Sequence, residues 1–254
     1  MSRINDRGLL SYIKQTGMRV LHEMQGKRFL HFLHIGKTGG TAVKYALTQH
    51  PIDSRYAIYL HRHEFRLKDV PIGEQVFFFV RDPISRFVSS FYSRQRQGQP
   101  RYFSAWKENE RSSFEEFTTP NQLALALSSN DAEKKSRARS AMKTIRHVRD
   151  SYWKWFDCEE YFRSRLSDVF FVGRQEGLAE DFEILKARLG LPEHLKLPGD
   201  DVNAHRTDKQ VDKSLDEEAV ANLRDWYEDD FRFVALCEDL RGTQARECPV
   251  DPAP

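Results

Sequence analysis

The sequence of 254 residues is poor in cysteine, has no long apolar run and carries almost no excess of charge of either sign. Its three cysteines, Cys158, Cys237 and Cys248, lie far apart and form no CxxC pair, which excludes a zinc signature and is typical of a reducing compartment. No stretch approaches the roughly 18 apolar residues that a membrane-spanning helix needs. The 40 basic and 38 acidic residues leave a net charge of +2, too small for a general nucleic-acid binder. The sequence therefore predicts a cytoplasmic protein with no transmembrane segment and no nucleic-acid partner.

The N-terminus lacks the apolar core of a secretory signal, because Lys14 and Arg19 interrupt its apolar residues. Those apolar residues fall near helical spacing, so residues 1–25 are expected to form a helical extension. Packing of this helix against the rest of the domain is favoured over contact with a membrane surface.

The apolar residues, 39% of the chain, are concentrated in short runs separated by helical patterns. The runs are Phe29–Ile35, Tyr56–Leu60, Val76–Val80 and Asp168–Val172. Continuous apolar runs are typical of buried parallel strands, and their alternation with helices predicts an α/β fold with a central, mainly parallel sheet flanked by helices. The length fits a single domain over residues 1–254.

The helical patterns differ in length. They cover Thr41–Gln49, a segment beginning at Asp82-Pro83, a long stretch from Ala138 to Phe156, Ala179–Leu189 with Gly190 after it, and one or two helices within Leu215–Leu240. Residues 95–111 are polar and contain Gly98 and Pro100, so residues 95–150 are expected to form a helical and loop insert. Residues 241–254 are expected to be a flexible tail.

The segment from His34 to Thr41, His-Ile-Gly-Lys-Thr-Gly-Gly-Thr, follows the first apolar run and opens a helical pattern. Glycines let a backbone approach an anion, a helix N-terminus offers N–H groups, and Lys37 adds a positive charge. A Walker A loop needs a glycine five residues before the lysine, and Phe32 stands there. The segment therefore shares the P-loop design without matching its nucleoside-triphosphatase form, which makes a kinase or NTPase the second hypothesis.

A second strand-to-helix junction follows the third run, at Val80-Arg81-Asp82-Pro83. Asp82 is suited to the N-cap and Pro83 to the first helical position. Ser85, Ser89 and Ser93 are spaced by four and share one helix face, which faces either a ligand or solvent. Two anion sites in one small domain suggest a ligand with phosphate groups at both ends.

Together these motifs resemble the sulfotransferases that use 3′-phosphoadenylyl sulfate (PAPS), most closely the carbohydrate (heparan-type 2-O and 6-O) enzymes and their bacterial relatives. The matching residues are Lys37, Thr38, Gly39, Gly40 and Thr41 for the 5′-phosphosulfate, Arg81 and Ser89 for the 3′-phosphate, and a later stretch from Val172 to Phe182. The resemblance implies a P-loop-like three-layer fold, release of adenosine 3′,5′-bisphosphate and no metal requirement. The implied acceptor is a hydroxyl group, expected on a sugar or glycoconjugate.

The reaction also needs a base that removes the proton of the acceptor hydroxyl, and a histidine suits this at neutral pH. Related enzymes place a catalytic histidine between the two anion sites, where this sequence has His61-Arg62-His63-Glu64. We expect His63 to be the base, with His61 as second choice and Glu64 as a weaker alternative. Lys37 is expected to neutralise charge on the bridging oxygen.

Two basic segments stay open between a binding role and plain solvation. His205 and Arg206 lie in a late loop that covers the nucleotide in related enzymes, so Arg206 is a candidate nucleotide contact. A cluster after residue 131 contacts either solvent or an anionic acceptor; its members are Lys134, Lys135, Arg137 and Arg139. A catalytically silent module that binds the bisphosphate is a further alternative.

Overall fold

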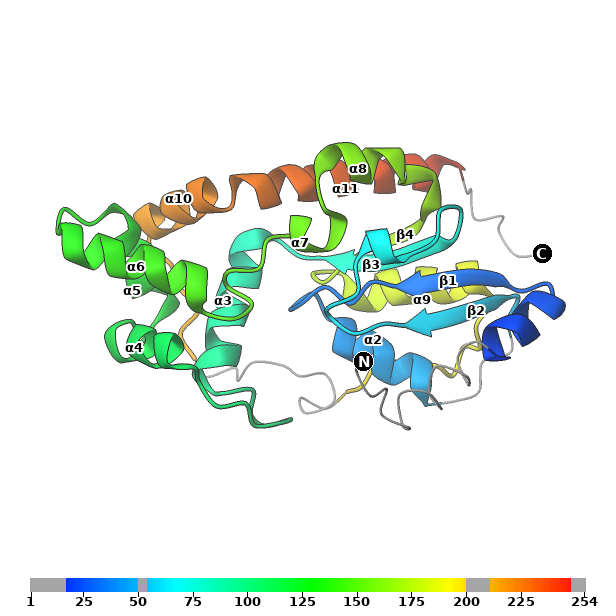
Figure 1. Ribbon diagram of the computed structural model, residues 1–254, viewed down its shortest axis with the longest axis horizontal. Helices are drawn as coiled ribbons and strands as arrows, with labels where there is room; N and C mark the ends of the chain where they lie inside the picture. The colour runs from blue at the N-terminus through cyan, green and yellow to red at the C-terminus, as the bar shows by residue number, and fades with distance from the viewer. Residues whose placement is uncertain (1–16, 50–53, 200–210, 248–254) are drawn as a thin grey trace, which may run out of the picture.

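The computed structural model describes residues 17–49, 54–199 and 211–247 (Figure 1). Its central sheet has the strand order β2-β1-β3-β4, and every pairing is parallel. The strands are β1 (Arg28–Phe32), β2 (Tyr56–Leu60), β3 (Gln75–Val80) and β4 (Val169–Arg174). Each of the four apolar runs overlaps a strand, so the expected α/β fold with a central parallel sheet flanked by helices is confirmed.

Side chains alternate between the two faces of the sheet, and helices cover both faces. Phe77 and Phe79 of β3 pack with α2 (Gly40–Thr48) and α9 (Leu178–Leu189) on one face. Phe78 points to the other face, where the covering helices are α7 (Trp153–Phe156), α8 (Glu159–Ser164) and α11 (Glu228–Glu247). The sheet is thus the middle of three layers.

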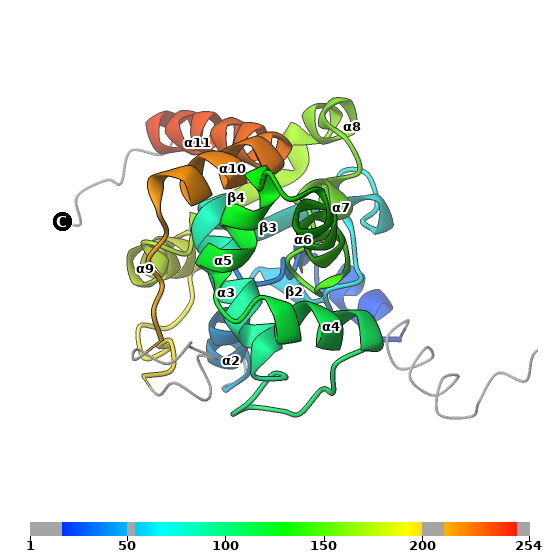
Figure 2. The ribbon, with the colours of Figure 1, turned by 90° about the vertical axis from the view of Figure 1, so that its left-hand side faces the viewer.

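A second group of helices lies beyond the carboxyl ends of the strands, on the left in Figure 1 and toward the viewer in Figure 2. It consists of α3 (Pro83–Gln95), α4 (Glu108–Glu116), α5 (Pro120–Leu125), α6 (Ala132–Thr144) and α10 (Glu217–Trp226), with a hydrophobic core of its own. Three short 3₁₀ helices complete the described elements: η1 (Leu67–Asp69), η2 (Ala126–Ser128) and η3 (Leu166–Asp168). Ligands of open parallel sheets bind at the carboxyl ends of the strands, so these helices stand beside the edge where a ligand is expected.

The prediction of one long helix from Ala138 to Phe156 is wrong. The helix α6 ends at Thr144, Ile145 is extended, and α7 begins only at Trp153. Ile145, Val148 and Tyr152 are buried as expected, but the turn between the two helices buries them. The buried apolar residues of the turn are therefore spaced as they would be on one face of a helix.

The C-terminal helix is longer than expected. The sequence predicts a tail from Arg241, whereas α11 continues to Glu247. The Arg241 guanidinium donates to the Val172 carbonyl (2.7 Å) and pairs with the Asp181 carboxylate (2.8 Å). The first part of the expected tail is therefore a helix end attached to β4 and α9.

The N-terminal extension is described from residue 17, and residues 17–24 are helical. The Arg19 guanidinium pairs with the Glu74 carboxylate and lies 4.3 Å from the centre of the Phe29 ring. This segment therefore packs on the sheet at Arg19, while Met24 on its surface is 82% exposed.

Candidate active site

The loop between β1 and α2, residues 34–41, is called the Lys37 loop below. Lys37 and Gly39 both have positive φ angles, 69° and 84°. Alternation of left- and right-handed backbone turns successive N–H groups toward one side, which forms a concave anion site. Gly39 is the N-cap of α2 and has no side chain to cap the helix, so the N–H groups of its first turn face the same anion site.

Close packing makes two glycines of the loop necessary. A Cβ atom on Gly40 would lie 2.3 Å from Cδ2 of His34, and one on Gly39 would lie 2.8 Å from Cδ2 of Leu178. The Thr38 hydroxyl is buried and donates to the Ile35 carbonyl (3.1 Å). Thr38 thus contributes to the loop chiefly by closing it, and only its backbone N–H remains as a donor to an anion.

The Lys37 ammonium lies in an electrostatic environment that disfavours its charge. Burial, and to a smaller extent the positive charges of Arg96 and Arg81, together lower the pKa of Lys37 to about 7. An anion in the loop would offset all three effects, because it stabilises the charged ammonium. The electrostatics of the loop would therefore favour a negatively charged ligand.

The second junction, residues 80–85, is called the Arg81 turn. The Tyr152 hydroxyl accepts from the Arg81 N–H (2.9 Å) and donates to the Arg81 carbonyl (2.7 Å), which fixes the backbone. The Arg81 guanidinium donates to the Ser85 hydroxyl (2.7 Å) and to the Lys37 carbonyl (3.4 Å). The structure thus brings the two predicted anion sites into direct contact.

The helix after this turn begins as the sequence predicts. The Asp82 carboxylate accepts from the Ser85 N–H (2.8 Å), and Pro83 is at the first helical position. Ser89 lies one turn beyond Ser85 on α3 and is half-buried. The Ser85–Ser89 face therefore runs away from Arg81 along one side of α3.

Arg86 has a structural role that the sequence did not reveal. Its buried guanidinium donates to the Gly36 carbonyl (3.1 Å) and pairs with Asp230 of α11 (3.2 Å). It also lies over the Tyr152 ring, 4.6 Å from its centre. Arg86 therefore connects the start of the Lys37 loop to α3 and α11.

His63 lies beside the Lys37 loop with a defined tautomer. Its Nδ1 is 2.8 Å from the His34 carbonyl, which can only accept, so Nδ1 carries the hydrogen and Nε2 the lone pair. The His63 ring lies 3.9 Å from the His34 ring, and the Trp155 indole donates to the His63 carbonyl (2.8 Å). Burial lowers the pKa of His63, so the imidazole is neutral at pH 7 and Nε2 can accept a proton.

The His61 side chain contacts His31 and Phe65 instead of the Lys37 loop. His31 Nε2 is 2.7 Å from the Glu74 carboxylate, so the neutral His31 ring presents a bare Nδ1 to His61 Nε2 at 2.8 Å. The His61 ring also stacks on Phe65, with ring centres 3.5 Å apart, and burial lowers the pKa of His61 to about 3. Its Nε2 hydrogen is engaged within the protein, and neighbouring Glu64 is exposed.

A third histidine, His147, also lies at this site. It belongs to the turn between α6 and α7, and its ring centre is 5.9 Å from that of His63. The sequence gave no signal for it, because Arg146-His147-Val148 fits the helical pattern that was expected there. Figure 1 shows the turn passing close to the carboxyl ends of the strands.

The comparison with protein families agrees with this geometry. Residues 23–234 match the family model described as the sulfotransferase family. The chain belongs to the sulfotransferase family. A search of curated proteins finds no match to it.

The remaining sequence expectations for this sulfotransferase concern residues away from these two junctions. Arg206 and His205 lie outside the described residues. The basic cluster is on the exposed side of α6, where Arg137 pairs with Glu116 (2.8 Å) and Glu133 (3.2 Å). Within the described ranges, no helix is long and apolar enough to cross a membrane, and no group of three or more His, Cys, Asp or Glu side chains is placed to hold a metal ion.

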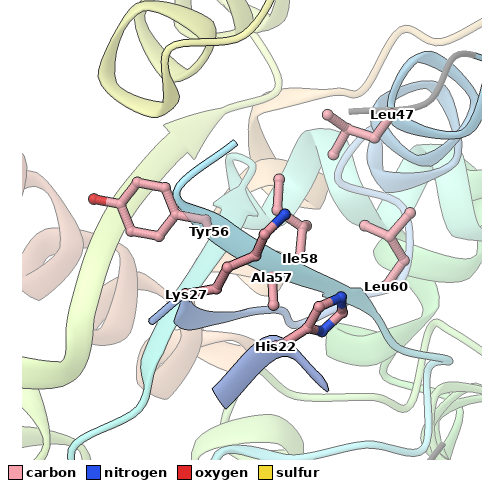
Figure 3. A pocket seen from close by; sticks show the side chains of 7 residues that line it. All are labelled: His22, Lys27, Leu47, Tyr56, Ala57, Ile58 and Leu60. Carbon is pink, nitrogen blue, oxygen red and sulfur yellow. The ribbon is translucent and has the colours of Figure 1, made fainter. Parts of the chain in front are cut away.

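A hollow beside the edge strand β2 is separate from this site. Side chains of the N-terminal segment, of α2 and of β2 line it (Figure 3). They are His22, Lys27, Leu47, Tyr56, Ala57, Ile58 and Leu60. None of them belongs to the Lys37 loop or to the Arg81 turn.

Proposed function

We propose that this sulfotransferase moves a sulfuryl group from PAPS to a hydroxyl group of a carbohydrate or glycoconjugate. The observation that carries the proposal is the contact between the two anion sites, where Arg81 donates to the Lys37 carbonyl. PAPS has a phosphosulfate at its 5′ end and a phosphate on the 3′ oxygen, and so needs two neighbouring anion sites. A P-loop-like cradle beside an arginine at the end of the next strand supplies them.

The residues present fit this donor. A Cβ on Gly39 or Gly40 would crowd Leu178 or His34, and burial together with the charges of Arg96 and Arg81 disfavours the Lys37 ammonium, which an anion would stabilise. In the proposed complex, Lys37 and the N–H groups of residues 38–41 hold the 5′-phosphosulfate. Arg81 and Ser89 hold the 3′-phosphate, and Arg206 stays an expected nucleotide contact.

When bound, PAPS supplies an activated sulfuryl group with a good leaving group, the 5′-phosphate of adenosine 3′,5′-bisphosphate. Lys37 stabilises the negative charge that develops on the bridging oxygen. His63 accepts the proton of the acceptor hydroxyl at Nε2, because the His34 carbonyl holds its Nδ1–H. We favour His63 over His61, since the Nε2 of His61 is occupied by His31.

Calorimetry separates this proposal from a P-loop kinase or NTPase. Adenosine 3′,5′-bisphosphate and ATP are titrated into the protein, each with and without magnesium. We expect the bisphosphate to bind more tightly than ATP and independently of magnesium. ATP-selective binding that requires magnesium would show that the proposed activity is wrong. Labelled PAPS and a panel of sugar acceptors then distinguish a working enzyme from a silent bisphosphate-binding module.

A further inference from the structure

His147 is held in an unfavourable backbone conformation in the middle of the candidate active site. Its φ angle is 67°, a left-handed value that residues with a Cβ rarely adopt. Its side chain is only 9% exposed. Non-glycine residues in such conformations gather at functional sites, where the surrounding structure holds them in place.

The imidazole of His147 covers the beginning of the Lys37 loop. A Cβ atom on Gly36 would lie 3.0 Å from His147 Nδ1, so the ring packs closely against the loop backbone and a larger residue at position 36 would push it aside. The charge of Lys37 acts on His147, and the His63 ring lies 5.9 Å away. His147 is thus close to both the loop lysine and the proposed base.

His147 Nδ1 is buried and, among the described residues, makes no hydrogen bond. The Asp150 carboxylate lies 3.7 Å from this nitrogen and also pairs with Lys154 (3.0 Å). That separation is too long for a hydrogen bond but short enough for an ion pair if the imidazole gains a proton. His147 and Asp150 are therefore placed to form a buried ion pair once the imidazole gains a proton.

We propose that His147 becomes an imidazolium when the donor nucleotide binds, with Asp150 as its counter-ion, and holds the negative charge at the 5′ end of the nucleotide together with Lys37. The inference rests on the proposed function, since it concerns the same loop. It assigns to His147 a binding role that is distinct from the base role of His63.

The charges around His147 explain why the proton arrives only with the anion. Burial first, and the charge of Lys37 in addition, lower the pKa of His147 to about 4, while Asp150 acts in the opposite direction. His63 also lowers the pKa of His147, and Lys154 and Arg149 form ion pairs with the Asp150 carboxylate. An anion placed against Lys37 and His147 raises the pKa of the imidazole, so the protein takes up a proton on binding at mildly acidic pH.

The test is the number of protons taken up when adenosine 3′,5′-bisphosphate binds at pH 6. It is measured calorimetrically in two buffers with different ionisation enthalpies. Lys37, with a pKa of about 7, is already mostly charged at this pH, and protons exchanged by the nucleotide cancel between protein variants. The variants are His147→Gln and Asp150→Asn, and the exposed His194→Gln serves as the matched control.

We expect the parent and His194→Gln to take up about half a proton more than His147→Gln and Asp150→Asn. The two site variants should also bind the bisphosphate about tenfold more weakly at pH 6. Asp150→Asn preserves shape, so it tests the idea even if His147→Gln folds poorly.

Equal proton uptake in the parent and in Asp150→Asn would overturn the role of His147 while leaving the proposed function intact. Failure of the parent to bind the bisphosphate would overturn both.

Discussion

At the scale of single residues, the two histidines of His61-Arg62-His63 have different surroundings although they are two positions apart. His63 presents a lone pair beside the Lys37 loop, whereas His61 gives its Nε2 hydrogen to a chain of contacts through His31 to Glu74. A base needs an accessible lone pair close to the anion site. Replacement of the two side chains should therefore affect the rate of sulfuryl transfer differently.

We expect His63→Gln to lower the rate of sulfuryl transfer about 10²–10⁴-fold, because general-base catalysis is lost. Its affinity for adenosine 3′,5′-bisphosphate should stay within a factor of about two. His61→Gln should lower the rate much less, since glutamine can still donate to His31. Initial rates with labelled PAPS, measured beside bisphosphate affinities, check this. A larger loss in His61→Gln than in His63→Gln would reverse the assignment.

Lys37 is expected to cost stability in the absence of its ligand. The pKa of Lys37 in the folded chain, about 7, is below the ordinary value of 10.5, so folding disfavours the charged ammonium. The penalty is fully present below pH 7 and disappears as the pH rises toward 10.5. Replacement of Lys37 by methionine should remove it.

Lys37→Met should therefore be more stable than the parent at pH 6 by about 1–2 kcal/mol, allowing for the part of the side chain that water reaches. The advantage should shrink between pH 7 and pH 10, and the variant should lose most of its affinity for the bisphosphate. Urea unfolding at several pH values measures the first effect and calorimetry the second. A variant that is less stable than the parent at pH 6 would contradict the prediction.

Candidate site residues that belong to a sequence motif could be identified from the sequence, and residues that join the site through tertiary contacts could not. Lys37 and Arg81 were found because each follows a buried strand and precedes a helix. His31 and Arg86 were missed because a polar residue within a strand or helix has no local signature; their partners, Glu74 and Asp230, are distant in sequence. His147 was missed because its left-handed turn is invisible in the pattern of apolar residues.

At the scale of elements, α3 joins the sheet to the outer helices through a buried ion pair. Arg86 on α3 pairs with Asp230 on α11, and both side chains are almost fully buried. Burial raises the pKa of Asp230, and the charge of Arg86 opposes that rise. Loss of Arg86 would leave an unpaired buried carboxylate, which is strongly destabilising.

Arg86→Met should destabilise the protein by about 3 kcal/mol at pH 7. The pKa of Asp230 would rise further in the variant, so its carboxylate would be protonated as the pH falls, and the deficit should be smaller at pH 5. Arg232→Met on the exposed side of α11 is the matched control and should change stability by less than about 0.5 kcal/mol. Denaturant unfolding at both pH values measures the difference. A deficit that grows toward pH 5 would show that Asp230 is not its source.

The elements of the sheet were easier to predict than those of the outer layer. Phe77, Phe78 and Phe79 are buried on both faces of β3, so their sequence is a continuous apolar run, which is typical of a buried strand. From Ala138 to Phe156, by contrast, apolar residues recur at helical spacing through both a helix and a turn. Only the path of the chain, with Ile145 extended, shows where α6 stops.

At the scale of the whole molecule, the core of the outer helices and the two cores around the sheet are linked by elements that cross between them. The outer core includes residues of α3 and α10, while α11 continues from α10 along the sheet (Figure 1). Tyr152, in the turn between α6 and α7, bonds to the Arg81 turn. Val148 in the same turn accepts a hydrogen bond from the Tyr227 hydroxyl (2.8 Å). These links favour cooperative unfolding of the described parts as one unit.

We therefore expect one thermal transition, with the same midpoint by far-UV circular dichroism and by tryptophan fluorescence. Trp106 packs with the outer core and Trp153 with a sheet core, so the fluorescence reports on both. Adenosine 3′,5′-bisphosphate at about 100 times its dissociation constant should stabilise the whole transition by roughly 2.7 kcal/mol. Two transitions, of which only one moves with ligand, would show independent units.

The contact between Arg81 and the Lys37 carbonyl would set the distance between the two proposed anion sites. Because Tyr152 also fixes the Arg81 backbone on both sides, we expect the fold rather than the ligand to determine that distance. The site would then select ligands in which two negative charges are separated by that distance. Among nucleotides of equal charge, those with both phosphates at one end of the ribose would span only one of the two sites, so the enzyme would discriminate by the spacing of charge rather than by its amount.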